Sequence, residues 1–382
     1  MDELQLHIPS RVFLGRETLS RLGGVAENFG ARALLVPDSI LADGPLPGRI
    51  AEILKRKGIQ LILAAGIEAD SFHDVVAEIV SLAKASRTQM IIGLGGIRTL
   101  STAKCAAALA GGDRRVDDLL DGYPVTSPRC SFIQVPTTFR DPFLLNHQLL
   151  MLDSRNRRAR ILEIPGLVPD AVILDPALTE TLPEKYVIST LLDTFLYALE
   201  GYLSLKNNFL SESLFLKSLA LVDGALKILG DPQHQEEFRD RACQAGISAA
   251  MGLAMSRLGA GSGLAFALGG RFAVPKSLLA AMMIPPVLEY GAAAAPDKLA
   301  RIAVILEADV RGMKPAQAAF RAVELMRERL GARIGELRIP NLRIRRDEMA
   351  DTAEFVHSYP MIKDMPGSLG VKDLQDMIRR AL

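Results

Sequence analysis

The chain has 382 residues, of which 49% are apolar and 23% are charged, with a net charge of +1. This length predicts two domains, each with a sizeable core. The balanced charge excludes a global electrostatic attraction to nucleic acid or to a membrane surface. The one dense basic run comprises Arg155, Arg157, Arg158 and Arg160, and we expect it to be a solvated loop.

Cysteine usage and the N-terminus both favour a cytoplasmic protein. Cys105, Cys130 and Cys243 are odd in number and far apart, which suits reduced thiols better than a disulfide framework. The first residues, MDELQLHIPSRV, lack the apolar region of a secretion signal. An alanine-rich stretch at 280–295 is interrupted by Pro285 and Pro286, so no membrane-spanning segment is predicted.

The first part of the chain alternates short apolar strands with helical patterns. Strands are predicted at 33–36, 60–64, 90–92 and 131–135, with a helix at 72–85. This order is typical of an α/β domain with a mainly parallel sheet.

The second part of the chain is predicted to be entirely helical. A segment at 165–183 carries four prolines and marks a crossover between domains. Helical periodicity follows it, at 191–205, 213–229, 236–255, 298–307, 316–330 and from 371 to the end. The prediction is a Rossmann-like α/β domain at 1–178 and an all-α domain at 179–382.

The most informative stretch is 89–106, QMIIGLGGIRTLSTAKCA. An apolar strand is followed by a turn, Gly93 to Gly96, and then by a helical pattern at 99–109 that contains Lys104. A strand, a glycine turn and a helix N-terminus together favour phosphate binding, because free N–H groups and the helix dipole face the anion. The same pattern also occurs as an ordinary turn in α/β domains.

An aspartate follows the strand at 33–36. From such a position the carboxylate of Asp38 can bind a ribose hydroxyl and repel an additional phosphate. The alternative is a residue that simply forms the turn.

The glycine stretch resembles the signature of the iron-type alcohol dehydrogenase superfamily. This superfamily includes glycerol dehydrogenases and is structurally akin to dehydroquinate synthases. The matching positions are Gly95, Gly96, Arg98, Thr99, Leu100 and Lys104. Two positions depart from the signature, since Ile97 replaces a glycine and Ser101 replaces an aspartate.

Two further segments extend the resemblance over most of the chain. Pro136, Thr137 and Thr138 match the start of the family's cofactor loop, but Arg140 and Pro142 stand at its glycine positions. The crossover matches at Pro169-Asp170, Leu174-Asp175-Pro176 and Leu182-Pro183.

The resemblance implies a dehydroquinate synthase-like fold and NAD(P)-dependent oxidoreduction of alcohols or aldehydes. It implies a small-molecule ligand in a cleft between the domains and a homodimer or larger assembly. An aspartate at the position of Asp38 implies NAD rather than NADP. The cofactor-binding residues that it implies are Asp38, Gly95, Gly96, Arg98, Thr137 and Thr138.

The family's metal ligands are mostly absent. The family binds iron or zinc through an aspartate and three histidines; Asp193 matches the aspartate, and Tyr197, Ser262 and Lys276 stand at the histidine positions. A neighbouring family histidine is replaced by Phe266. Hydroxyls are poor ligands for these ions and an ammonium group has no lone pair. We therefore expect no bound metal.

Three functions remain open. In the first, Tyr197, Lys276, Ser262 and Asp193 are the catalytic residues of a metal-independent oxidoreductase, with the tyrosine as acid and base. In the second, the protein is an inactive homologue with a binding or regulatory role, because Ile97 and the segment at 139–142 obstruct the phosphate site; a positive φ at Ile97 would also be strained. In the third, Arg98, Arg140 and Lys276 bind an anionic metabolite.

Overall fold

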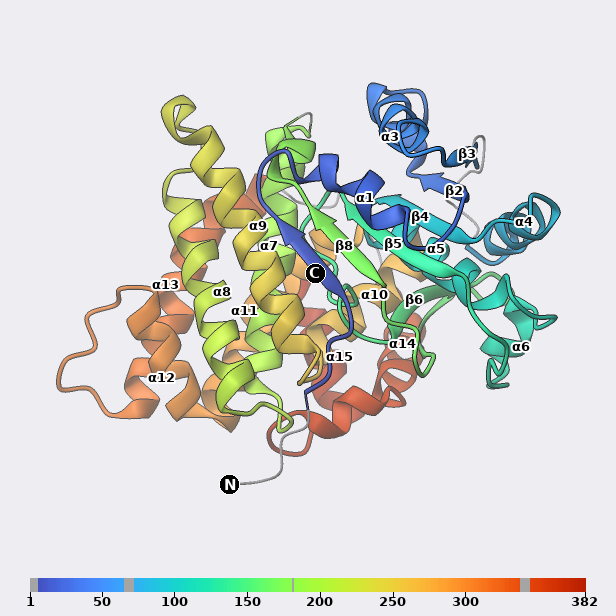
Figure 1. Ribbon diagram of the computed structural model, residues 1–382. Coiled ribbons are helices and arrows are strands. Elements are labelled where there is room, and N and C mark those ends of the chain that lie inside the picture. Colours follow the sequence, from blue (N-terminus) through green and yellow to red (C-terminus); the bar gives the residue numbers. More distant parts are fainter. Residues whose placement is uncertain (1–5, 65–71, 181, 337–343) are drawn as a thin grey trace. The chain divides into compact units, whose positions relative to one another are not determined.

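The computed structural model describes residues 6–64, 72–180, 182–336 and 344–382. The chain divides into two compact units, Met1–Leu182 and Pro183–Leu382. We call them the N-terminal unit and the C-terminal unit, and each is described by itself (Figure 1).

The N-terminal unit is built on a parallel sheet of six strands, in the order β1-β8-β5-β4-β2-β3. The predicted α/β class is confirmed. The strands are β1 (Arg11–Leu14), β2 (Arg32–Pro37), β3 (Gln60–Leu63), β4 (Met90–Gly95), β5 (Ser131–Pro136) and β8 (Ala171–Leu174). The sequence did not predict β1 or β8, which are short and lie beside each other.

The central strand β4 is longer than predicted. Its pairing with β5 continues to Gly95, which lies opposite Pro136. Gly93, Leu94 and Gly95 therefore belong to the strand, and the assignment of these residues to the turn was wrong. The turn is reduced to Gly96, which precedes the helix α5 (Ile97–Leu109).

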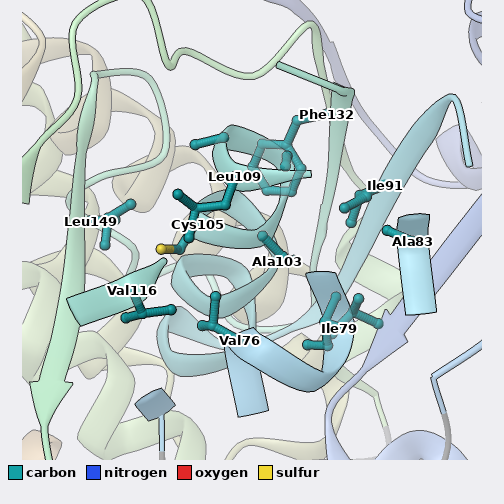
Figure 2. Close-up of a cluster of buried hydrophobic side chains, with 14 of the residues drawn as sticks. Val76, Ile79, Ala83, Ile91, Ala103, Cys105, Leu109, Val116, Phe132 and Leu149 are labelled. Carbon is teal, nitrogen blue, oxygen red and sulfur yellow. The ribbon is translucent and has the colours of Figure 1, made fainter. Parts of the chain in front are cut away.

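Helices cover both faces of this sheet and bury two apolar cores. One core includes residues of α1 (Leu22–Ala26) and α3 (Pro45–Lys55). The other lies among α4 (Phe72–Ala85), α5 and the sheet, with side chains such as Val76, Ile79, Leu109 and Phe132 (Figure 2). Each large apolar side chain that is fully buried contributes about 1.5–3 kcal/mol. In the described part of this unit, the remaining α-helices are α2 (Ser39–Ala42) and α6 (Val116–Leu120).

An antiparallel hairpin that the sequence did not predict adjoins the second core. It consists of β6 (Gln148–Asp153) and β7 (Arg158–Glu163), and its residue Leu149 packs in that core. The basic run that was predicted to be a solvated loop therefore comprises the hairpin turn and the first residues of β7.

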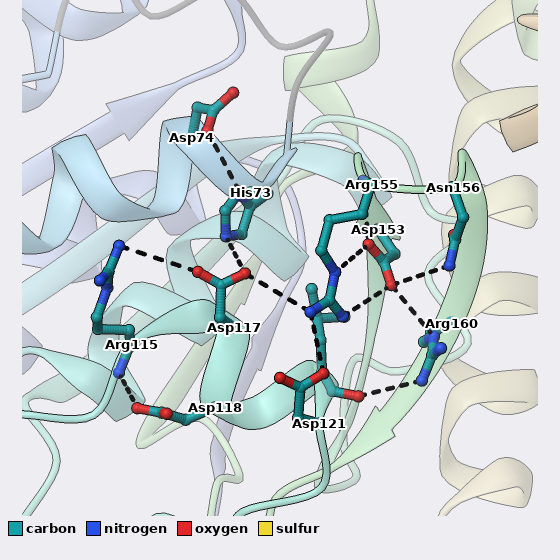
Figure 3. Close-up of polar contacts among 11 residues, drawn as sticks. His73, Asp74, Arg115, Asp117, Asp118, Asp121, Asp153, Arg155, Asn156 and Arg160 are labelled. Atoms are coloured by element: carbon teal, nitrogen blue, oxygen red, sulfur yellow. Dashed lines mark hydrogen bonds and ion pairs between the residues drawn. The ribbon is translucent and has the colours of Figure 1, made fainter.

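Ion pairs fasten the hairpin to α6 (Figure 3). Asp153 is fully buried and accepts from Arg155 Nε at 2.9 Å and Nη2 at 3.0 Å. Arg155 Nη1 also reaches Asp121 at 3.0 Å, and Arg160 Nη1 donates to the carbonyl oxygen of Leu120 at 3.1 Å. These hydrogen bonds from Arg155 lower the pKa of Asp153. Arg155 is exposed, as expected for a solvated basic run, and Arg160 is half-buried.

The C-terminal unit contains helices only, within the described part of the chain, as predicted. The α-helices are α7 (Glu184–Leu203), α8 (Phe209–Lys227), α9 (Gln235–Leu253), α10 (Ala260–Phe272), α11 (Lys276–Ala294), α12 (Pro296–Ile305), α13 (Pro315–Glu336), α14 (Arg346–His357) and α15 (Val371–Ala381). Helix α11 packs against α7, α10 and α13 and lies at the centre of this unit.

Helix α11 continues through Pro285 and Pro286. By length and hydropathy alone this helix would suffice to cross a membrane. However, 61% of its apolar window is buried inside the structure, as in the central helix of a packed domain.

Candidate functional site

The junction between β4 and α5, at Gly95 and Gly96, fits a phosphate group; we keep the name glycine turn for these two residues. Gly95 has a φ of +154°, and a Cβ there would lie 2.8 Å from Asp38 Cβ and 3.0 Å from Thr99 Cβ. Only glycine satisfies both the backbone and the space. Gly96 is the N-cap of the 13-residue helix α5 and makes no side-chain cap, so this helix start is suited to an external anion.

Asp38 lies directly beside this turn. Its backbone N–H donates to Leu94 O at 2.7 Å, which keeps the end of β2 against β4. Its carboxylate accepts from Thr99 Oγ1 at 3.1 Å and from Ile40 N at 3.3 Å. The residue therefore forms the turn into α2, as in the simpler interpretation, and is also fixed beside the proposed phosphate site.

Ile97 does not have the strained backbone that the second hypothesis considered. It is the first residue of α5, its side chain is only 4% exposed, and it is not among the described non-glycine residues with positive φ. The strain argument against cofactor binding was wrong. The following residue, Arg98, is exposed on the same first turn.

The threonines after β5 also lie at the glycine turn. Thr137 N donates to Gly95 O at 3.0 Å. Thr138 Oγ1 would be 3.4 Å from a Cβ on Gly96, and it is buried without a hydrogen-bond partner among the described residues. The predicted cofactor residues on β2, β4 and the loop after β5 are thus brought together.

Lys104 anchors the loop that follows these threonines. Its side chain is 1% exposed, and Nζ donates to the carbonyl oxygens of Phe143 at 2.9 Å, Asn146 at 2.6 Å and Gln148 at 2.8 Å. Burial lowers the pKa of Lys104 to about 7, and the carboxylate of Asp141 opposes this shift. The lysine of the motif lies in the middle of α5 and anchors this loop.

A second group of predicted residues meets in the C-terminal unit. Lys276, the first residue of α11, donates to the carboxylate of Asp193 on α7. The Lys276 Nζ lies 4.0 Å from the centroid of the Tyr197 ring and 4.6 Å from that of Phe266 on α10. We call Asp193, Tyr197, Phe266 and Lys276 the Lys276 cluster. All of its members are at most 9% exposed.

Ser262 has a different partner. Its hydroxyl donates to the carboxylate of Glu200, which also accepts from Gly261 N at 2.6 Å, from Gly259 N at 3.1 Å and from Ser262 N at 3.1 Å. Burial raises the pKa of Glu200 to about 7, against these hydrogen bonds. The sequence analysis missed Glu200. The available signal was its position on one helix face, seven residues after Asp193 and three after Tyr197.

The hydroxyl of Tyr197 is the unusual atom of the cluster. The residue is 1% exposed, and this oxygen has no hydrogen-bond partner among the described residues. Leaving a buried hydroxyl unpaired costs about 1–3 kcal/mol. Such a group in a native structure calls for an explanation, and a catalytic role is one of the few known.

The residues of the cluster do not fit the metal ion that the resemblance implies. The carboxylate of Asp193 is already paired with an ammonium group, and the other family positions carry a phenol, a hydroxyl and that ammonium. Iron and zinc require imidazole, thiolate or carboxylate ligands. The described residues contain no group of three His, Cys, Asp or Glu side chains suited to a metal.

Two family models match nearly all of the chain. The model of the family "iron-containing alcohol dehydrogenase" matches residues 9–176, and the model of its C-terminal domain matches residues 187–382. A lactaldehyde reductase of Escherichia coli (strain K12) is 25% identical over 317 residues, which cover 82% of each protein. An NAD-dependent methanol dehydrogenase of Bacillus methanolicus is 22% identical over 380 residues, covering 98% of this chain and 99% of the relative.

Solved structures agree with this fold. A 1,3-propanediol oxidoreductase has a TM-score of 0.91 at 20% identity, with 100% of both chains covered. An alcohol dehydrogenase from Oenococcus oeni has a TM-score of 0.90 at 21% identity, again over both chains in full. Together with the two family models, which span nearly all of the sequence, these matches show that the chain belongs to the iron-containing alcohol dehydrogenase family.

Proposed function

We propose that this protein is an NAD(P)-linked oxidoreductase of alcohols and aldehydes whose reaction does not depend on a metal ion. Family membership supports the reaction class, and the relatives named above act on lactaldehyde and methanol. The cation required beside the substrate oxygen is then the ammonium group of Lys276, held by Asp193.

The N-terminal unit supplies the nucleotide site in this proposal. Gly95, Gly96 and the start of α5 fit a pyrophosphate, with Thr137, Thr138 and Arg98 beside them. Asp38 would accept from a ribose hydroxyl, which favours NAD over NADP. When bound, the nicotinamide supplies or accepts the hydride.

Tyr197 supplies the proton in this proposal. During reduction its Oη would donate a proton to the substrate oxygen, and the phenolate that remains would be stabilised by the Lys276 ammonium. Ser262 acts only through Glu200, because its hydroxyl is bonded there. The observation that carries the proposal is the buried Tyr197 hydroxyl, which is unpaired among the described residues and belongs to a ring beside a buried ammonium.

Replacing Tyr197 by phenylalanine tests the proposal. We expect Tyr197→Phe to reduce kcat for NADH-driven aldehyde reduction by about 100- to 10,000-fold, the usual contribution of a general acid. The affinity for NADH, measured by fluorescence titration, should not change. Tyr202→Phe is the matched control, since Tyr202 is equally buried on α7 but outside the cluster. Unchanged turnover in Tyr197→Phe would contradict the proposal.

The residues of the Lys276 cluster are buried and contact one another, which favours a second candidate function, a binding or regulatory homologue without catalysis. Lys276 is satisfied by one carboxylate and two aromatic faces, so the four residues could be a structural plug. A thermal-shift panel separates the two, because a ligand that binds only the folded state raises Tm. Shifts with NAD or NADH support the oxidoreductase, shifts only with anionic metabolites support a metabolite-binding protein, and no shift with any of them supports an interaction protein.

A further inference from the structure

Two anchors hold α7 on either side of Tyr197. Asp193 lies one turn before it and pairs with α11 through Lys276, whereas Glu200 lies one turn after it and binds the start of α10. The side chains at positions 193, 197 and 200 share one face of the helix. The ion pair of Asp193 and the hydrogen bonds of Glu200 therefore fix the segment of α7 that carries Tyr197.

The Glu200 anchor also reaches Phe266. Ser262 is in the first turn of α10, and Phe266 follows it by four residues, so the two side chains lie on the same side of that helix. Phe266 contacts Lys276, and Lys276 in turn pairs with Asp193 on α7. These contacts connect α7, α10 and α11. Of the residues that make them, Glu200 alone is neither in the Lys276 cluster nor at a position matched to a family ligand.

Among the residues that the structure describes, Glu200 forms no ion pair. The groups that contact it are N–H groups and one hydroxyl, all from Gly259, Gly261 and Ser262. The atoms that line the same place from α11 and from the end of the chain are apolar, namely Val287 Cγ2 and Met365 Sδ. The carboxylate thus acts on the N-terminus of α10, where the helix dipole favours a negative charge.

The spacing around this contact is tight. A Cβ on Gly261 would lie 2.7 Å from Val287 Cγ2 and 3.0 Å from Glu200 Oε1, and a Cβ on Gly259 would lie 2.9 Å from the same oxygen. The helices approach closely here because α10 begins with small residues. Removing the carboxylate would leave the N–H groups of Gly259, Gly261 and Ser262 buried without their acceptor.

We propose that Glu200 is the positioning residue of the Lys276 cluster: by binding the start of α10 it fixes Tyr197 and Phe266 against the Lys276 ammonium. The catalytic consequence rests on the proposed function, in which Tyr197 donates the proton. The structural consequence does not, and the experiment measures the two separately.

The structural readout is ¹⁹F NMR of protein labelled with 3-fluorotyrosine. The chain has six tyrosines, and Tyr197→Phe identifies the signal of Tyr197. We expect Glu200→Gln to move that signal, Ser262→Ala to move it less, and Ser262→Thr, which keeps a hydroxyl, to restore the wild-type position. Glu237→Gln is the matched control, because Glu237 lies on α9 of the same unit and pairs with Arg241 at the surface.

The catalytic readout is the division between kcat and the affinity for NADH. A displaced proton donor lowers kcat by about 10- to 100-fold, since an error of about 1 Å has effects of this size. Glu200→Gln should show this loss with unchanged NADH affinity, and Glu237→Gln should behave as wild type.

An unmoved Tyr197 signal in folded Glu200→Gln overturns the proposal. If that variant does not fold, Ser262→Ala decides in the same way, because it removes only the hydroxyl donor. If the wild-type protein shows no turnover, the proposed function fails, and a shifted Tyr197 signal still supports the positioning role.

Discussion

The ammonium nitrogen of Lys276 lies over the ring of Tyr197, 4.0 Å from its centroid. A desolvated cation–π contact of this kind contributes about 2 kcal/mol. Together with Asp193, the ring replaces the water that the charge loses on burial. The buried Lys276 ammonium is thus stabilised by one carboxylate and two aromatic rings, so the stability of the cluster depends on all its members.

Breaking the ion pair should be costly, and removing both charges should not. Asp193→Asn and Lys276→Met each leave one buried charge unpaired, for which we expect a loss of about 3–5 kcal/mol in the free energy of unfolding. The double variant Asp193→Asn/Lys276→Met should recover most of this loss. Urea unfolding measures all three variants, and additive losses in the double variant would contradict the buried pairing.

Chelation should have no effect on this protein. Because Asp193 is already paired, dialysis against EDTA should leave Tm unchanged, and elemental analysis should find far less than one iron or zinc per chain. Asp193→Asn is the control for any residual metal. The opposite result, a stoichiometric ion that Asp193→Asn removes together with a fall in Tm, would mean that Lys276 leaves the site when metal binds.

Gly95 should not tolerate a side chain. In Gly95→Ala the new Cβ meets Asp38 at 2.8 Å and the φ of +154° is unfavourable, so we expect a loss of about 1–3 kcal/mol and weaker NADH binding. Gly24→Ala is the control, because nothing lies within 4 Å of a Cβ there. In helix α1 that change should be neutral or stabilising by up to about 1 kcal/mol. Thermal unfolding and NADH titration measure both; wild-type NADH affinity in Gly95→Ala would argue against a nucleotide at this turn.

Lys104 should make stability depend on pH. Its pKa is about 7 in the folded protein and 10.5 when exposed, so between these values the unfolded chain holds a proton that the folded protein does not. Stability therefore rises with pH through this window, by on the order of 3–5 kcal/mol. Unfolding from pH 7 to 9.5 should show a smaller rise in Lys104→Met than in wild type. Equal slopes would mean that the three carbonyl acceptors keep Lys104 charged.

The fold was largely predictable because its signals are local. Helix α4 was predicted with its observed bounds, and the central strands were found from short apolar runs. Strand β1 was missed because its residues are partly exposed at the edge of the sheet, and β6 and β7 because a basic turn suggested a loop. The helical periodicity predicted for the second part of the chain holds even at Pro285 and Pro286, which lie inside α11.

For the site, the sequence predicted which family positions are involved but not how their side chains contact one another. The sequence placed Asp193, Tyr197 and Lys276 at matching family positions, and the structure brings these side chains together. It could not show that Ser262 bonds to Glu200, since that contact depends on how α10 packs against α7. Nor could it show that Ile97 begins a helix with ordinary φ, because the backbone there is set by the pairing of β4 with both neighbours.

Strand β1 pairs with β8, so that Arg11 lies opposite Ala171. During synthesis on the ribosome, the first strand emerges long before its partner. Until β8 is made, the sheet of the nascent N-terminal unit lacks this strand. The pairing of β1 with β8 joins residues that are far apart in sequence, and such contacts form slowly. A stalled chain that ends before β8 should therefore be sensitive to protease and recruit chaperones, whereas one extended past Leu182 should become resistant.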